Sequence, residues 1–204
     1  ALGSYQTNSY ILTADESSQF CVIIDTGLQN SELIEYLHNA SLTPEALILT
    51  HGHADHIAGV RDLRREFPDI VVAIHTDDAE MLVNPIKNLS ALAGVNIKSD
   101  PADRLLEDGQ EISFANIDFK VLHTPGHTPG GICLYNSVDQ VVFSGDALFA
   151  GSIGRTDFPG GNQTKLIQSI KEKLLPLPGQ TKVYPGHGTS TMITLEKTGN
   201  PYLV

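Results

Sequence analysis

Short runs of apolar and β-branched residues recur along the chain, and turn residues such as Gly, Pro, Asn and Asp separate them. Runs of this length and composition are typical of β-strands. The Asp108-Gly109 pair is a turn signal in the same pattern. The pattern predicts nine strands, which are Ser9–Thr13, Phe20–Asp25, Ala46–Leu49, Val71–Ile74, Glu111–Phe114, Phe119–His123, Ile132–Tyr135, Val141–Ser144 and Lys182–Tyr184.

Three other stretches repeat apolar residues at every third or fourth position, as one face of an α-helix does. They are Leu33–Leu37, a helix that opens near Asp55 and runs through Phe67, and Leu166–Leu174, which Pro176 ends. Residues 76–94 are less regular, with a helix-start pattern followed by an interrupting proline. Strands with helices dispersed between them predict an α+β fold in which sheets pack together beneath helices.

The length of 204 residues suits one domain, and no linker or low-complexity segment divides the chain. The longest apolar runs, such as Phe20–Ile24, are far shorter than the ~20 residues of a membrane-spanning helix. No signal-peptide pattern opens the chain, although it starts at Ala1 without Met, as it would after removal of a presequence. Cys21 and Cys133 lie in predicted strands and are interpreted as small core residues. We expect one domain over 1–204 in the cytoplasm or another reducing soluble compartment.

Acidic residues outnumber basic ones, with 24 Asp+Glu against 13 Lys+Arg and a formal net charge of −11. Such a charge repels phosphate backbones, and no basic cluster is longer than Arg64-Arg65. We therefore expect neither a nucleic-acid nor a membrane partner. The sequence does not fix the oligomeric state.

Histidine is the residue type that points to chemistry, because three of the eight lie within residues 51–56. In an extended segment His51 and His53 point to the same side. Asp55 and His56 fall at the start of the predicted helix, where a carboxylate is stabilised by unpaired N–H groups. Imidazole and carboxylate groups bind zinc, iron and manganese alike. The segment therefore predicts a metal centre at a strand-to-helix turn.

Three further ligand candidates also follow predicted strands. Pro-Gly-His triplets present His127 and His187, and the fixed φ of Pro with the freedom of Gly turns the chain sharply there. Asp146 ends another apolar strand. Five histidines and two aspartates at strand ends are enough ligands for two divalent ions bridged by a carboxylate.

The segment His51-Gly52-His53-Ala54-Asp55-His56, with the three later residues, resembles the metallo-β-lactamase superfamily over almost the whole chain. The resemblance implies a four-layer αββα sandwich with the metal site at one edge of two facing sheets. It implies that His51, His53 and His127 bind the first metal, that Asp55, His56 and His187 bind the second, and that Asp146 bridges them.

An aspartate at 146, with no cysteine among the ligands, is more similar to the glyoxalase II (hydroxyacylglutathione hydrolase) branch than to the zinc β-lactamases. The segment Gly151–Gly161 resembles a signature of short hydroxyacylglutathione-hydrolase-like proteins, and it resembles the persulfide dioxygenases too. Longer glyoxalase II proteins carry a C-terminal helical domain that helps to hold glutathione. Here 204 − 187 = 17 residues follow the last candidate ligand, so we expect those contacts to be absent.

The resemblance implies a metal-dependent hydrolase of thioesters such as S-lactoylglutathione and other S-acylglutathiones. A metal-bridging hydroxide would attack the carbonyl carbon, with Asp55 orienting it and Asp146 holding the metals together. Zinc is the first expectation for the two ions, with iron and manganese as alternatives. The alternative enzyme is a mononuclear iron persulfide dioxygenase that uses His53 or His51 with His127 and Asp146. A non-catalytic metal-binding domain is a third interpretation, which the complete ligand set disfavours.

Other residues have weaker roles in this prediction. Asp25, at a strand end, is expected either to hydrogen bond a ligand histidine or to cap a turn. Arg155 and Asp157 are expected to pair and brace the loop beside Asp146, and Arg155 is the nearest cation for an anionic substrate. The remaining pocket candidates are Tyr135, Asn136, Lys165 and residues 84–94, while His38, His75 and His123 are interpreted as ordinary residues.

Overall fold

The computed structural model describes residues 1–204 and contains two main sheets. The first has five strands in the order β1 (Tyr10–Leu12), β2 (Phe20–Ile24), β3 (Thr43–Ile48), β4 (Val71–His75) and β5 (Arg104–Leu106). β1 is antiparallel to β2, and β2 to β5 run parallel to one another. Almost continuous apolar runs such as Cys21–Ile24 suit these parallel strands, because both faces of the sheet are covered.

The second sheet has six strands, and β10 and β11 form a separate ribbon. Its order is β13 (Thr191–Met192), β12 (Lys182–Pro185), β9 (Val141–Gly145), β8 (Ile132–Asn136), β7 (Ile117–His123) and β6 (Glu111–Phe114). The ribbon pairs β10 (Leu148–Phe149) with β11 (Ser152–Ile153). β12 runs parallel to β9, whereas the other neighbours in the sheet are antiparallel. It follows that β7, β9 and β12 all end at the same edge.

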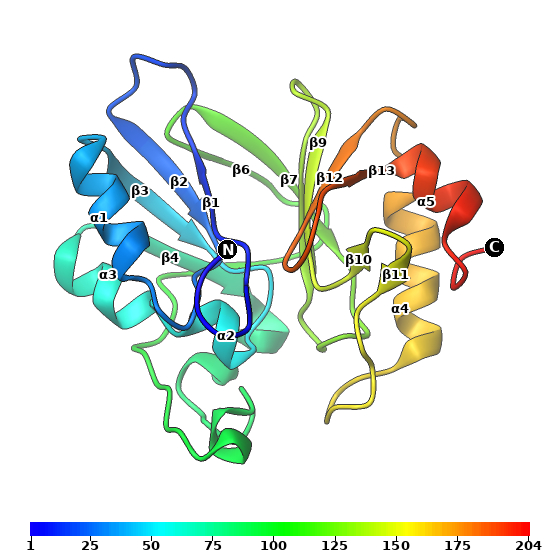
Figure 1. Cartoon of the computed structure of the whole chain (residues 1–204), viewed down its shortest axis with the longest axis horizontal. Helices are drawn as coiled ribbons and strands as arrows, with labels where there is room; N and C mark the ends of the chain where they lie inside the picture. Colours follow the sequence, from blue (N-terminus) through cyan, green and yellow to red (C-terminus); the bar gives the residue numbers. More distant parts are fainter.

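Helices cover the outer faces of both sheets (Figure 1). The first half of the chain contains α1 (Ser31–Asn39), α2 (Ala54–Ile57) and α3 (Val60–Glu66). The second half contains α4 (Gln163–Ser169), which the short π-helix η3 (Ile170–Leu174) continues, and α5 (Ile193–Gly199). The 3₁₀ turns η1 (Thr76–Leu82) and η2 (Ser90–Ala93) lie between β4 and β5. None of these helices has both the length and the apolar composition needed to cross a membrane.

Three clusters of buried apolar residues fill the spaces between the layers of the fold. The central one lies between the facing sides of the two sheets and includes Ile48 from the first sheet and Phe119 and Phe143 from the second. A second lies between the first sheet and α1 and α3, and a third lies between the second sheet and the α4 and α5 side. The predicted four-layer αββα sandwich is therefore confirmed.

All nine predicted strands are present, with ends shifted by at most three residues. The four missed strands, β5, β10, β11 and β13, have only two or three residues each. The single helix predicted through Phe67 is wrong, because the chain forms α2 and α3 with a break at Gly59. There Thr26 Oγ1 accepts the Gly59 N–H at 2.9 Å, and the Asn30 amide donates to the Gly59 carbonyl at 3.1 Å. The Gly59 N–H thus bonds outside the helical pattern, while the Gly59 carbonyl also accepts the Leu63 N–H at 3.0 Å as α3 begins.

Candidate metal centre

The structure brings all seven predicted ligands to one edge of the sandwich. The segment Thr50–His56 follows β3, and loops after β7, β9 and β12 supply the other three residues. Three groups have ligand atoms that lie within 4.8 Å of one another: His51, His53 and His127; Asp55, His56 and His187; and His51, His56 and Asp146. The first two groups are the sets expected for two ions. Metal binding by these residues stays a prediction that their placement supports.

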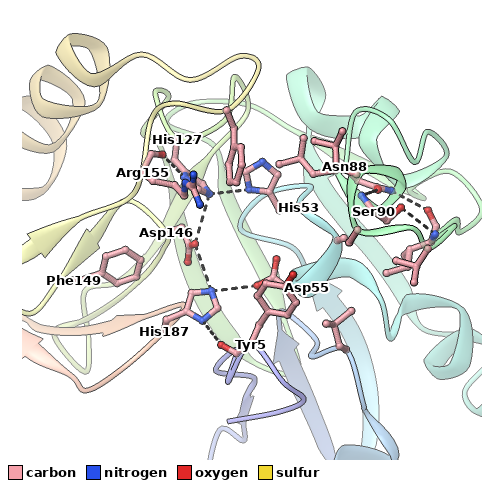
Figure 2. A pocket seen from close by; sticks show the side chains of 18 residues that line it. Tyr5, His53, Asp55, Asn88, Ser90, His127, Asp146, Phe149, Arg155 and His187 are labelled. Carbon is pink, nitrogen blue, oxygen red and sulfur yellow. Dashed lines mark hydrogen bonds and ion pairs between the residues drawn. The ribbon is translucent and has the colours of Figure 1, made fainter.

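Asp146 lies between the two sets (Figure 2). Its Oδ2 is 3.6 Å from His127 Nε2 and 3.5 Å from His187 Nε2. Its Oδ1 is 3.5 Å from His56 Nε2. One carboxylate thus reaches residues of both groups, as a bridging ligand must.

Two buried polar atoms in the centre have no hydrogen-bond partner, namely His51 Nε2 and Asp146 Oδ1. Unpaired buried polar atoms are rare in folded proteins and each requires an explanation. Both atoms belong to the predicted ligand set and both face the other imidazoles. A divalent cation would satisfy them, so the residues present fit a metal.

Three of the histidines are oriented by a bond from the ring nitrogen that faces away from the centre. The Nδ1–H of His127 donates to the Arg155 carbonyl at 2.7 Å, and that of His187 donates to the Tyr5 carbonyl at 3.1 Å. The Nδ1–H of His56 donates to Asp25 Oδ2 at 2.9 Å. These bonds fix the tautomer and leave each Nε2 lone pair directed at the centre, which is the usual arrangement of metal-binding histidines.

Asp25 makes both of the contacts that were considered for it. Besides the bond from His56, its carboxylate accepts the Thr50 backbone N–H at 2.7 Å and the Thr50 hydroxyl at 2.6 Å. The residue is buried and has a left-handed backbone with φ of 56°. It therefore ties the end of β2 to the start of the ligand segment while it holds the His56 ring.

Burial and neighbouring charges perturb the titration of these groups. Burial lowers the pKa of His51 well below its ordinary value, and burial with the His127 charge lowers that of His53 to about 3. Burial also acts to lower the pKa of His56, but the carboxylates of Asp25, Asp146 and Asp55 outweigh it and raise the pKa to about 10. The surrounding carboxylates therefore favour a positive charge next to them, which the protonated His56 ring carries here. A bound cation would supply this charge in place of the proton.

A buried carboxylate outside the predicted set holds two ligand loops together. Asp78 in η1 accepts the Gly52 N–H at 3.0 Å and the Gly130 N–H at 2.6 Å. Gly52 lies between His51 and His53, and Gly130 follows His127 by three residues. Burial raises the pKa of Asp78. No local sequence signal links this aspartate to either loop.

The two Pro-Gly-His triplets need glycine for different reasons. Gly126 has a φ of +135°, as the sharp turn predicts. Gly186 instead lies against the centre, where a Cβ would collide with Asp146 Oδ1 and approach His56 Cε1 to 2.7 Å. The second glycine is thus required by close packing on two of the proposed ligands.

Arg155 and Asp157 form the expected pair. Arg155 Nε is 2.8 Å from Asp157 Oδ1 and Nη2 is 2.7 Å from Oδ2, and the guanidinium lies over the Phe158 ring at 3.8 Å. Because the Arg155 carbonyl accepts the bond from His127, the braced loop also positions that ring.

The proposed ligands line one side of a cavity of about 660 Å³. The other walls come from the N-terminal segment, from Phe149 at the end of β10, from the loop that carries Phe158, and from residues 88–97 (Figure 2). Of the weaker pocket candidates, the 84–94 stretch contributes to the lining, whereas Tyr135, Asn136 and Lys165 do not.

The three remaining histidines lie outside the centre. His38 pairs with Glu66 at 2.8 Å on the surface. The rings of His75 and His123 stack at 4.0 Å with an interplanar angle of 16°. Their ligand atoms and that of Asp77 are close together, but nearly parallel rings do not direct their lone pairs to one point, so we assign no metal there.

Comparison with known proteins identifies the family of this chain. The model of the Metallo-beta-lactamase superfamily matches residues 2–187. The probable metallo-hydrolase YqgX of Bacillus subtilis is 40% identical, over 99% of this chain and 94% of that protein. The hydroxyacylglutathione hydrolase GloC of Haemophilus influenzae is 35% identical, over 98% of this chain and 94% of that protein.

Solved structures are also similar to this chain. The BLEG-1 B3 metallo-beta-lactamase is 44% identical with a TM-score of 0.94, over 100% of this chain and 97% of that one. TTHA1623, solved in a di-iron-bound form, is 37% identical with a TM-score of 0.87, over 99% and 98% of the two chains. ETHE1 from Myxococcus xanthus is 31% identical with a TM-score of 0.79, over 97% and 79%.

Proposed function

The chain belongs to the metallo-beta-lactamase superfamily, and from this premise we propose that it is a metal-dependent hydrolase of thioesters such as S-lactoylglutathione and other S-acylglutathiones. The observation that carries the proposal is the Asp146 carboxylate between two complete sets of ligand candidates. The similarity to a hydroxyacylglutathione hydrolase supports the same class of substrate.

The seven proposed ligands would hold two ions. His51, His53 and His127 would hold one ion, Asp55, His56 and His187 would hold the other, and Asp146 would join them. Two divalent ions at such a site supply a hydroxide at neutral pH and polarise a carbonyl oxygen. Thr7 donates to Asp55 Oδ2 at 2.9 Å and so orients this carboxylate toward the centre. Zinc, iron and manganese all suit these ligands, and the di-iron form of TTHA1623 supports a pair of ions.

The leaving group favours thioesters over amides. A thiol with a pKa near ~8.5 leaves as a thiolate, whereas an amide nitrogen must be protonated as it leaves. Beyond the proposed ligands, the cavity is lined by no further carboxyl or imidazole group that would serve as a separate acid. Both cysteines are free and buried, which suits the cytoplasm or another reducing compartment.

The test combines metal counting with an assay of S-lactoylglutathione and related thioesters. We expect two ions per chain in the active protein and loss of most activity in Asp146→Ala, because the only carboxylate that reaches both sets is removed. An Asp146→Ala protein that keeps both ions and full hydrolysis would overturn the assignment. A β-lactam should be included, given the similarity to BLEG-1.

A mononuclear iron persulfide dioxygenase is the second candidate, because Asp146 lies near His127 in an arrangement that one iron would also accept. One iron per chain with oxygen uptake on a persulfide would establish it in place of the hydrolase. The complete second set, Asp55, His56 and His187, favours the binuclear hydrolase.

A further inference from the structure

The wall of the cavity opposite the proposed ligands is apolar and belongs to residues 88–97. Leu89, Leu92, Val95 and Ile97 line the cavity from this segment. Leu92 is 73% exposed and Val95 is 49% exposed. Exposed apolar side chains that gather at one concave site mark a surface that binds an apolar group.

Hydrogen bonds fix this wall to the ligand segment. The buried Asn88 side chain donates to the Met81 and Ile97 carbonyls, both at 2.9 Å. The Asn88 carbonyl accepts the N–H of Ala54, the residue between His53 and Asp55, at 2.9 Å. Ser90 Oγ accepts the Ile97 N–H at 3.1 Å and closes the segment on itself. The wall is therefore a built structure held at a set position relative to the reacting centre.

Apart from the proposed ligands, the lining of the cavity carries little charge. Arg155 is the only cationic side chain other than histidine that lines it. Asp157 already pairs with this guanidinium, and Phe158 stacks on it. Apart from the proposed ligands, the lining therefore offers a charged group one cation that is already engaged, whereas it offers the acyl chain of a thioester an extended apolar wall.

We propose that residues 88–97 bind the acyl chain of the substrate, so that the preferred substrates are thioesters of medium-length, unbranched apolar acyl groups. This inference rests on the proposed thioester hydrolysis and adds a substrate class to it. The carbonyl would lie at the centre, the chain would run over Leu92 and Val95, and the thiol portion would point toward the open side of the cavity.

The proposal predicts a dependence on chain length. Burial of one methylene group contributes ~0.8 kcal/mol, which corresponds to roughly a fourfold gain in kcat/KM when the group is held in the transition state. Acetyl, butyryl, hexanoyl and octanoyl thioesters of N-acetylcysteamine, which carries no net charge, isolate this effect from any recognition of glutathione.

The experiment compares this series in the metal-loaded wild-type protein and in Leu92→Ser and Val95→Ser. Both side chains are exposed and neither is a proposed ligand, so the variants should keep their fold and metal content. Val138→Ser is the matched control, because Val138 is 83% exposed and does not line the cavity. Binding of S-octyl-N-acetylcysteamine, a thioether that cannot be hydrolysed, gives a calorimetric readout besides activity.

We expect kcat/KM to rise about fourfold per methylene in the wild type and in Val138→Ser. In Leu92→Ser and Val95→Ser the rise per methylene should shrink, so that the octanoyl thioester loses more kcat/KM than the acetyl thioester, and thioether binding should weaken. A flat series in a protein that hydrolyses the acetyl thioester would overturn the acyl-chain site and leave the proposed function standing. An unchanged slope in both variants would overturn it as well. Thioether binding that depends on Leu92, without hydrolysis of any thioester, would overturn the function and retain an apolar-chain site.

Discussion

The replacement Asp25→Asn tests whether the hydrogen bond behind His56 controls the second metal site. The carboxylate of Asp25 accepts three bonds, two from Thr50 and one from the Nδ1–H of His56. Asparagine has nearly the same shape and tolerates the left-handed backbone at this position, but one of its two side-chain ends can only donate.

The amide can satisfy only one of the two fixed donors. With its oxygen toward the Thr50 N–H, its NH₂ group faces His56, and the ring must either lose its bond or move its proton to Nε2. A proton on Nε2 blocks the nitrogen that faces Asp146 and His187. With the amide reversed, the buried Thr50 N–H is left unpaired at a cost of about 1–3 kcal/mol.

Loss of such an orienting partner typically weakens metal binding by about 10–100-fold, which corresponds to ~1.4–2.8 kcal/mol. We expect this loss at the site of Asp55, His56 and His187, and a smaller loss at the site of His51, His53 and His127, which Asp25 reaches only through the Thr50 hydroxyl, 3.2 Å from His51 Nδ1. Native mass spectrometry counts the ions, and competition with a chromophoric chelator gives the two affinities.

The control is Asp62→Asn, which makes the same chemical change on the surface of α3, where Asp62 contacts Arg65 at 3.1 Å. Its two affinities should equal those of the wild type. Two ions bound by Asp25→Asn with wild-type affinities would refute the reasoning, and so would an equal loss at both sites.

Two further predictions concern buried groups. Asp78→Ala leaves the N–H groups of Gly52 and Gly130 without their acceptor, so the free energy of unfolding in urea should fall by about 1–3 kcal/mol and metal affinity should fall with it; an unchanged urea midpoint would contradict this. Burial raises the pKa of Cys21 to about 11 and that of Cys133 to about 12. At pH 8 both groups are therefore protonated thiols, and a thiol reagent should label them only after denaturation, with rapid labelling of the native protein as the opposing result.

The long strands and the proposed ligands could both be predicted from the sequence, because buried apolar strands end at polar residues. A stretch buried on both faces of a sheet, such as Ala46–Ile48 at the end of β3, must be apolar, and the polar residues that follow it are then conspicuous. The ligand candidates stand at such boundaries. The four missed strands, β5, β10, β11 and β13, carry no comparable signal, because two or three residues are too few to form an apolar run or an alternating pattern.

Contacts between distant segments explain what the sequence does not reveal. The break between α2 and α3 depends on Thr26 and Asn30, which precede Gly59 by about thirty residues. Asp78 joins loops that are 26 and 52 residues away from it. The apolar residues of 88–97 show no helical or strand periodicity. The sequence therefore does not indicate that they form one wall of the cavity, which is seen only in the fold.

The direction of the strands explains why the proposed ligands and the proposed acyl-chain site lie on different segments of this fold. Parallel β2, β3 and β4 end at one edge of the first sheet, and β7, β9 and β12 end at one edge of the second. Strand ends held by the apolar core give the proposed ligands fixed positions. The connection from β4 to β5 supplies none of those ligands, yet it provides the apolar wall and meets the ligand segment through the bond from Ala54 to Asn88. Under the proposed function, we expect changes at its exposed side chains to alter the preferred acyl group, and changes at Asn88 to disturb the wall and the centre together.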